Sequence, residues 1–282
     1  MKTLFLYLFI FLSILHNQTI IEQNQKTLVF FMNQLLPSLF ILCVFVQLIP
    51  IPSIKKQRKI KLFNIDLSSL FLIIKMILLG NPGNSYIINQ FVLEKQISIQ
   101  QAKRLIYCVS IPSISFMLMT IPYLYNIEIA FILFVIHLLT IFILLIFTRH
   151  IPIYLNIHIK EKTLIEALLF SIKTMALILA YLFVVASIQS MLFIYFPKLN
   201  LLIHLLMEFS SGVSYFVHSN HPILYLLVCI GFGGFCAHIQ IMSGCDEIKL
   251  NYFYYLFFRI SHIFISLLIY FIVKSLFLFY LL

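Results

Sequence analysis

The sequence predicts an all-α, polytopic integral membrane protein with about eight or nine membrane segments, two of them broken by glycine. Three observations support this expectation. First, 62% of the 282 residues are hydrophobic and 10% are charged, whereas a soluble domain carries about 25% charged residues. Second, apolar runs recur at lengths near the ~20 residues that a spanning helix needs. Third, lysines and arginines lie in the short polar stretches between these runs, as in cytoplasmic loops.

The composition also excludes several classes of function. The net charge of +10 does not indicate nucleic-acid binding, because the basic residues are strung out between apolar runs. The five cysteines show neither a CxxC pair nor a zinc-ligand spacing. No enzyme motif or phosphate-binding loop is present. We therefore expect no enzymatic activity, cofactor or metal, and the partners expected are the lipid bilayer and a small polar or anionic solute.

The N-terminal part predicts two helices. An apolar run after Lys2 predicts a retained first helix over 3–21, since no small-x-small cleavage site of a signal peptide follows it. Residues 1–26 are thus expected to form an N-terminal membrane helix, and residues 27–282 a single membrane domain. A second span over 27–49 contains Pro37.

The next apolar run, residues 67–79, is shorter than the ~20 residues that a helix needs to cross a membrane. Residues 67–79 are mostly apolar and end at Gly80-Asn-Pro-Gly83. The flanking stretches, 55–61 and 95–104, are both basic and therefore read as cytoplasmic. Residues 66–93 would then enter and leave on the same side, as a re-entrant hairpin with its tip near the glycines. A span kinked by glycine and proline is the alternative.

The rest of the chain predicts a series of helices. Ser98 and Gln101 have the spacing of a capping box, so a helix begins there. A basic loop around Arg149 and Lys162 separates two groups of spans. The expected spans cover residues 105–125, 128–147, 163–196, 200–218, 222–244 and 253–280.

Two predicted helices carry a polar stripe, which is costly in a membrane and indicates function. On each helix the polar residues recur at steps of three and four and so share one face. The first stripe is His204, Glu208, Ser211, Tyr215 and His218; the second is Arg259, His262, Ser266 and Tyr270. Glu208 and Arg259 could form a buried ion pair that fixes helix packing. Alternatively, Arg259 faces a cavity and binds a carboxylate in bidentate fashion.

The glycines are confined to two regions. Gly80 and Gly83 come first, and the other five glycines lie between 212 and 244. Arg104 follows the first glycine pair at a spacing similar to that of Arg259 after Gly231-Phe-Gly-Gly234. This pattern predicts a pseudo-repeat of two related halves, about 27–147 and 163–282. Paired, interrupted segments in corresponding halves indicate a transporter binding site.

Four segments in this order also carry a family resemblance. They are Leu35-Leu-Pro-Ser-Leu-Phe40, Gly80-Asn-Pro-Gly-Asn84 with Ile97–Leu105, Leu206–Gly212, and Gly231–Gln240. Together they resemble the nucleoside-recognition (Gate) domain membrane proteins, most closely the YlbJ-type sporulation integral membrane proteins, over roughly residues 27–275. The chain departs from the family in being shorter and in having Gly80-Asn-Pro82 where the family has Gly-Tyr-Pro.

The resemblance implies an all-helical protein of the cell membrane or forespore membrane that moves a small anion such as dipicolinate during sporulation. The expected substrate-binding residues are Glu208, Ser211, His238, Gln240 and Arg259. The residues expected to shape the site are Gly80, Pro82, Gly83, Gly212, Gly231, Gly233 and Gly234. The alternative is a non-transporting scaffold or assembly factor that binds a second copy or other sporulation membrane proteins. In that case the polar stripes would only hold helices together.

Overall fold

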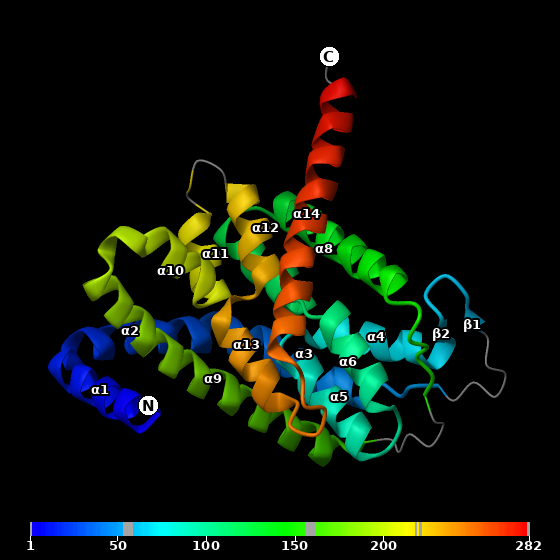
Figure 1. The fold of residues 1–282 in the computed structure, drawn as a ribbon, viewed down its shortest axis with the longest axis horizontal. Helices are drawn as coiled ribbons and strands as arrows, with labels where there is room; N and C mark the ends of the chain where they lie inside the picture. Colours follow the sequence, from blue (N-terminus) through cyan, green and yellow to red (C-terminus); the bar gives the residue numbers. More distant parts are fainter. Residues whose placement is uncertain (1, 53–58, 156–161, 218, 220–221, 281–282) are drawn as a thin grey trace.

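The computed structural model describes residues 2–52, 59–155, 162–217, 219 and 222–280 (Figure 1). The described chain is mostly helical, and its strands form one short antiparallel hairpin of β1 (Lys59–Ile60) and β2 (Ile65–Asp66). His218, which was placed on the first polar stripe, and residues 55–58 of the first basic loop lie outside the described residues.

Long apolar helices confirm the predicted class. Within the described residues, five helices are long and apolar enough to cross a membrane. They are Asn17–Leu48, Ile127–Phe147, Leu164–Tyr195, Pro222–Gly244 and Tyr252–Leu276. The chain is therefore an all-α membrane protein.

The N-terminal helices divide at a different residue from the one expected. Helix α1 (Lys2–Leu15) ends just before His16, and α2 (Asn17–Phe30) folds back from it (Figure 1). The helix continues through η1 (Phe31–Leu35) and α3 (Leu36–Leu48), so the polar residues after His16 extend the second helix and do not end the first. The wider π turn η1 lies directly before Pro37, where it relieves the clash of proline with the preceding turn.

The first half contains two interrupted segments. Helices α4 (Leu67–Leu79) and α5 (Gly83–Leu93) are separated by a break at Gly80–Pro82. Helix α6 (Ile99–Cys108) begins at the predicted capping box and is followed by an extended stretch to Ser113, then η2 (Phe116–Thr120) and α7 (Ile121–Leu124). The continuous span expected over 105–125 is therefore wrong. Pro112 favours extended backbone at the residue before it, which ends the helix.

The second half is interrupted in the same way. Helix α9 (Leu164–Tyr195) is followed by η3 (Pro197–Leu199) and α10 (Asn200–Leu206). The next helices are α11 (Phe209–Phe216), α12 (Pro222–Phe232), α13 (Gly234–Gly244) and α14 (Tyr252–Tyr280). The continuous helix expected over 200–218 is wrong, because the chain turns at Met207 and Glu208.

Rings from the two sides of this turn confirm that it is a hairpin. His204 of α10 stacks on Tyr215 of α11 with ring centroids 3.9 Å apart. The described residues of the first polar stripe are therefore divided: His204 lies in α10, Glu208 is the N-cap of α11, and Ser211 and Tyr215 lie in α11.

The order of elements recurs on either side of residue 155. Each half has a long helix, a helix pair with a short break, a second interrupted segment and a final long helix. By this order the break at Gly80 corresponds to the turn at Met207, and the extended stretch after α6 corresponds to Gly233. The pairing of Gly80 with Gly231 that the spacing suggested is therefore not the one that element order supports.

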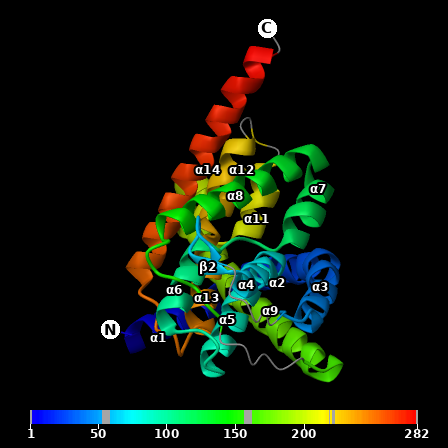
Figure 2. The same ribbon diagram turned by 90° about the vertical axis from the view of Figure 1, so that its right-hand side faces the viewer.

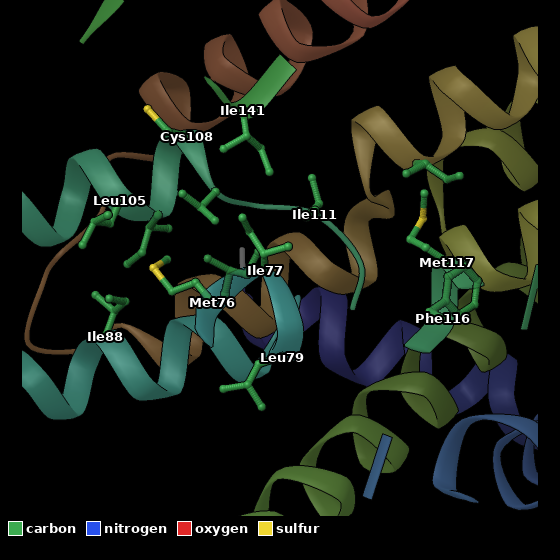
Figure 3. Packing of buried hydrophobic residues seen from close by; sticks show 14 of the residues in the cluster. Met76, Ile77, Leu79, Ile88, Leu105, Cys108, Ile111, Phe116, Met117 and Ile141 are labelled. Atoms are coloured by element: carbon green, nitrogen blue, oxygen red, sulfur yellow. The ribbon is translucent and has the colours of Figure 1, made fainter. Parts of the chain in front are cut away.

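The long helices of the two halves pack in pairs. Both α2 and α3 lie along α9, and α14 packs against α8 (Ile127–Phe147) and α12 (Figures 1 and 2). Inside, α4, α5 and α6 share an apolar core in which Met76, Ile88 and Leu105 are fully buried (Figure 3). In a bilayer such packing is favoured by dispersion contacts, since lipid is as apolar as leucine.

Arg104 fastens the connecting loops to this core. Its guanidinium donates to the carbonyl oxygens of Phe63 (2.7 Å), Leu145 (2.8 Å) and Ile151 (2.6 Å), and to the Thr148 hydroxyl (3.0 Å). The side chain is 2% exposed. Arg104 of α6 thereby binds the end of α8, the residues that follow it and the loop that precedes α4.

The break at Gly80 depends on the absence of a side chain. Gly80 has φ +61°, and a Cβ atom there would overlap the backbone of Pro112 and Ser113. We expect Gly80→Ala to destabilise the protein by about 3 kcal/mol. This corresponds to a melting temperature lower by roughly 6–12 °C in a thermal scan of the detergent-purified protein.

Gly83→Ala is the matched control, since its Cβ would lie 3.4 Å from the Leu79 Cβ and its φ is ordinary. Its melting temperature should stay within about 3 °C of the native value. Equal shifts in the two variants would show that the close approach at Gly80 does not matter.

Candidate substrate-binding site

The two interrupted segments of the first half cross each other. The break at Gly80–Pro82 lies against the extended stretch Val109–Ser113, and backbone groups freed by the breaks bond across the crossing. The Asn81 amide donates to the Ile111 carbonyl (2.8 Å), and the Asn84 side chain donates to the Val109 carbonyl (2.8 Å). The breaks of the first crossing therefore find hydrogen-bond partners inside the protein, as a helix break within a bilayer would need.

The second half forms an equivalent crossing. The turn at Met207–Glu208 lies against the break at Gly233, and the Cys236 amide donates to the Met207 carbonyl (3.0 Å). Gly234 has φ +71°, and a Cβ there would come within 2.9 Å of the Phe209 backbone nitrogen. Glycine is required here for the backbones to approach each other.

The two crossings meet at a small inner cavity of about 30 Å³. Its polar lining comes from both halves. It consists of Asn81 and Ser113 from the first crossing and Glu208, Ser210 and Gln240 from the second, together with Pro82 and apolar side chains. The two glycine-rich regions of the sequence are thus brought to one place.

Glu208 is the acidic group of this cavity. It is the N-cap of α11, and its carboxylate accepts bonds from the Ser210 amide (2.9 Å), the Ser211 amide (2.6 Å) and the Ser210 hydroxyl (2.6 Å). The residue is 6% exposed. A carboxylate at a helix N-terminus is stabilised by these donors and by the helix dipole.

An outer cavity of about 230 Å³ lies on the other side of Glu208. Leu182, Glu208 and Ser210 line both cavities, so the carboxylate stands between them. The further polar residues of the outer cavity are Gln23, Lys26, Thr27, Gln189, Ser211 and Ser214. A polar route thus reaches the crossing from the side where α2 and α9 pack together.

Arg259 does not pair with Glu208, so the predicted ion pair is wrong. Its guanidinium donates to the Ser110 carbonyl and reaches the carbonyls of Tyr107 (3.4 Å) and Gly231 (3.5 Å). The Tyr107 and Gly231 oxygens belong to the last turns of α6 and α12, where helix carbonyls lack intrahelical partners and the dipole is negative, and Ser110 lies in the extended stretch that follows α6. With 0% exposure, Arg259 holds two helix ends together in the interior.

Of the other predicted site residues, some line a cavity and one bonds to a backbone carbonyl at a helix end. Gln240 lines the inner cavity and Ser211 the outer one. His238 lines neither of them, because its Nε2 donates to the Phe232 carbonyl at the end of α12 (2.9 Å). Of the five expected side chains, three face cavities and two satisfy backbone carbonyls.

The predicted shaping residues lie at breaks or at close helix contacts. Pro82 and Gly83 begin α5, and Gly233 takes a left-handed conformation with φ +85°. A Cβ on Gly212 would overlap the His204 carbonyl, and one on Gly231 would lie 3.0 Å from Cγ1 of Ile263 in α14. Gly212 and Gly231 therefore serve close packing and not chain breaks.

A buried histidine pair lies beside the site. His137 of α8 and His262 of α14 are 2.9 Å apart through Nδ1 and Nε2 and are both fully buried. In sequence His137 reads as a lone structural histidine, since a partner 125 residues away leaves no local signal. Among the described residues, no group of three His, Cys, Asp or Glu side chains is placed to hold a metal ion.

Sequence reasoning missed Asn81, Ser113 and Ser210 as cavity residues. Each lies next to a chain break, and Asn81 and Ser113 each adjoin a proline. Polar residues beside Gly or Pro in apolar surroundings were the available signal, because a broken helix exposes backbone that polar neighbours must satisfy.

No family model matches the chain, and neither a curated protein nor a solved structure matches it. The resemblance to the Gate-domain proteins therefore stays a prediction from the segments named above.

Replacing Arg259 should affect stability and not solute recognition. Arg259→Gln leaves the buried Ser110 and Gly231 carbonyls without a charged donor, which costs about 2–3 kcal/mol. We expect a melting temperature lower by roughly 4–12 °C in detergent. Arg149→Gln, which changes an exposed arginine, should leave it within about 2 °C. A fully stable Arg259→Gln protein would contradict the capping role.

Proposed function

We propose that the chain is a transporter-like protein of the cell membrane that binds a small polar solute where the interrupted segments of its two halves meet. The observation that carries this proposal is the inner cavity, whose polar lining comes from both crossings. Solute sites of secondary transporters lie at such repeat interfaces, between discontinuous helices.

The membrane arrangement follows from the same proposal. The helix pairs α4–α5 and α10–α11 are re-entrant hairpins, and the segments α6–α7 and α12–α13 cross as interrupted spans. Counted with α1 and the long helices, they make about nine membrane segments. Two such halves form the pseudo-repeat. The recurring order of elements and the enclosure of all four breaks within protein support this arrangement.

The solute is a neutral or cationic polar molecule. Among the described residues that line the inner cavity, Glu208 is the only Asp, Glu, Lys, Arg or His side chain. A negative charge at this position favours neutral and cationic groups and repels a dianion. A dianion such as dipicolinate would need a cation in the cavity, whereas Arg259 is engaged by helix carbonyls. The placement in a sporulation membrane rests on the family resemblance alone.

The size of the inner cavity implies movement during transport. About 30 Å³ accommodates little more than a water molecule, so the closed crossing must open to admit a solute. The hairpin α10–α11 is the mobile element, because it carries Glu208 and separates the inner cavity from the outer one. Alternating access of this kind moves one repeat against the other.

The second candidate is a non-transporting scaffold. One observation favours it: the Glu208 carboxylate, His238 Nε2 and both terminal nitrogens of the Arg259 guanidinium have hydrogen-bond partners within the protein, although Arg259 Nε has none among the described residues. Polar groups arranged in this way stabilise helix packing without any ligand. This candidate predicts that neutralising Glu208 lowers the amount of folded protein and that no solute is transported.

Uptake into proteoliposomes distinguishes the two candidates. The purified protein is reconstituted, and uptake of radiolabelled uridine, lysine and dipicolinate is followed with time. We expect saturable uptake of a neutral or cationic solute and none of dipicolinate. In Glu208→Gln the uptake should fall at least about tenfold, while the melting temperature changes by less than about 4 °C, since the amide still caps α11.

The control is Glu128→Gln, which removes an exposed carboxylate in the first turn of α8. Its uptake should equal that of the native protein. Uptake that survives intact in Glu208→Gln would remove Glu208 from the site, and uptake of dipicolinate alone would overturn the proposed charge of the solute.

A further inference from the structure

A second cavity lies apart from the proposed solute site. It measures about 410 Å³, within the range of small-molecule pockets, and is bounded by the end of α3, the hairpin α4–α5 and the start of α9. Glu208 and the helix crossings do not line it. Its lining includes Pro52, which precedes the first basic stretch of the sequence, and Lys162, which ends the second.

Two lysines line this cavity, and their partners are neutral. Lys75 of α4 is 7% exposed and donates to the Ile49 carbonyl (2.7 Å). Lys162 donates to the side-chain oxygens of Gln47 (2.5 Å) and Gln90 (2.6 Å). Burial lowers the pKa of Lys162, an effect that the carboxylates of Glu94 and Glu166 oppose. Two ammonium groups at one cavity repel each other unless an anion separates them.

The acidic residues of the cavity lie at its rim. Glu94 and Glu166 are exposed, whereas Lys75 is buried and Lys162 half-buried. Glu94 accepts a bond from the Gln90 amide (2.7 Å), and Glu166 accepts bonds from Thr163 at the start of α9 (2.8 and 3.1 Å). Exposed charges are screened by water and buried ones are not. The interior of the cavity is therefore positive although its formal charges balance.

Both lysines have N–H donors that do not bond to the described residues. An ammonium group has three N–H donors. Lys75 uses one of them and Lys162 two with the described residues. The remaining donors belong to groups that line one cavity, so both lysines offer donors to an anion bound there. Such convergence of charge and donors is the chemistry that recognises a phosphate group.

We propose that this cavity binds a phosphate group, carried by an anionic phospholipid or present as free phosphate. Basic loops mark the cytoplasmic side of a membrane protein, and basic pockets between membrane helices on that side bind anionic headgroups. The ligand is distinct from the transported solute and holds the hairpin α4–α5 against α3 and α9. The inference does not depend on the proposed transport activity.

The test is a ligand-dependent shift in melting temperature of the full-length protein purified in a neutral detergent. Phosphatidylglycerol, phosphatidylcholine and inorganic phosphate are added separately. Phosphatidylglycerol or inorganic phosphate should raise the melting temperature by roughly 5 °C. A shift with phosphatidylglycerol alone identifies a lipid headgroup, and a shift with inorganic phosphate identifies the free anion.

The variants Lys75→Met and Lys162→Gln should each lose most of this shift, measured against their own melting temperature without ligand. Lys198→Gln, which changes an exposed lysine outside the cavity, should retain it. Should Lys75→Met fail to fold, Lys162→Gln alone decides. No shift with either ligand, an equal shift with phosphatidylcholine, or an undiminished shift in the lysine variants would overturn the proposal.

Discussion

The structure depends on how backbone groups are satisfied where helices break inside the membrane. A bilayer offers no water to an N–H or C=O group, so each break must find its partners in the protein. Here the breaks are arranged as two crossings. In each crossing, one broken segment forms hydrogen bonds to the other. Arg259 completes the arrangement by donating to the Ser110 carbonyl, which follows α6, and to the Gly231 carbonyl near the end of α12, one from each half. Arg259 thereby joins the two halves close to their breaks.

This requirement determines which polar residues remain for a ligand. Arg104 and Arg259 are both buried, and both are engaged by backbone carbonyls at helix ends. His238 likewise donates to a backbone carbonyl at the end of α12, that of Phe232. A side chain that replaces a missing helix partner cannot release it without exposing a buried carbonyl, which costs about 1–3 kcal/mol. Glu208 differs, because its carboxylate lies between two cavities.

Sequence patterns predicted the features that depend on neighbouring residues along the chain. The long apolar helices, the break at Gly80 and the capping box at Ser98 and Gln101 were all predicted and are present. The failures came from assuming that helical periodicity continues through apolar sequence. Glu208 fitted a polar stripe, yet it is the N-cap of α11, and its carboxylate accepts bonds from the Ser210 and Ser211 amides. Partners of Arg259 and Lys162 lie 149 and 115 residues away, where periodicity carries no information.

Separation of charge gives the two cavities different roles. The inner cavity holds one carboxylate beside the crossings, and the cavity near the basic loops holds two lysines at its interior. An anion bound by the lysines would brace α4–α5, the hairpin of the first half. The carboxylate of Glu208 instead belongs to α10–α11, the hairpin of the second half, and is held by only three donors within its own helix turn. A solute that competes for those donors would loosen the start of α11. Under the two proposals the equivalent hairpins differ in function: a bound anion holds α4–α5 in place, and α10–α11 responds to the solute at the crossing.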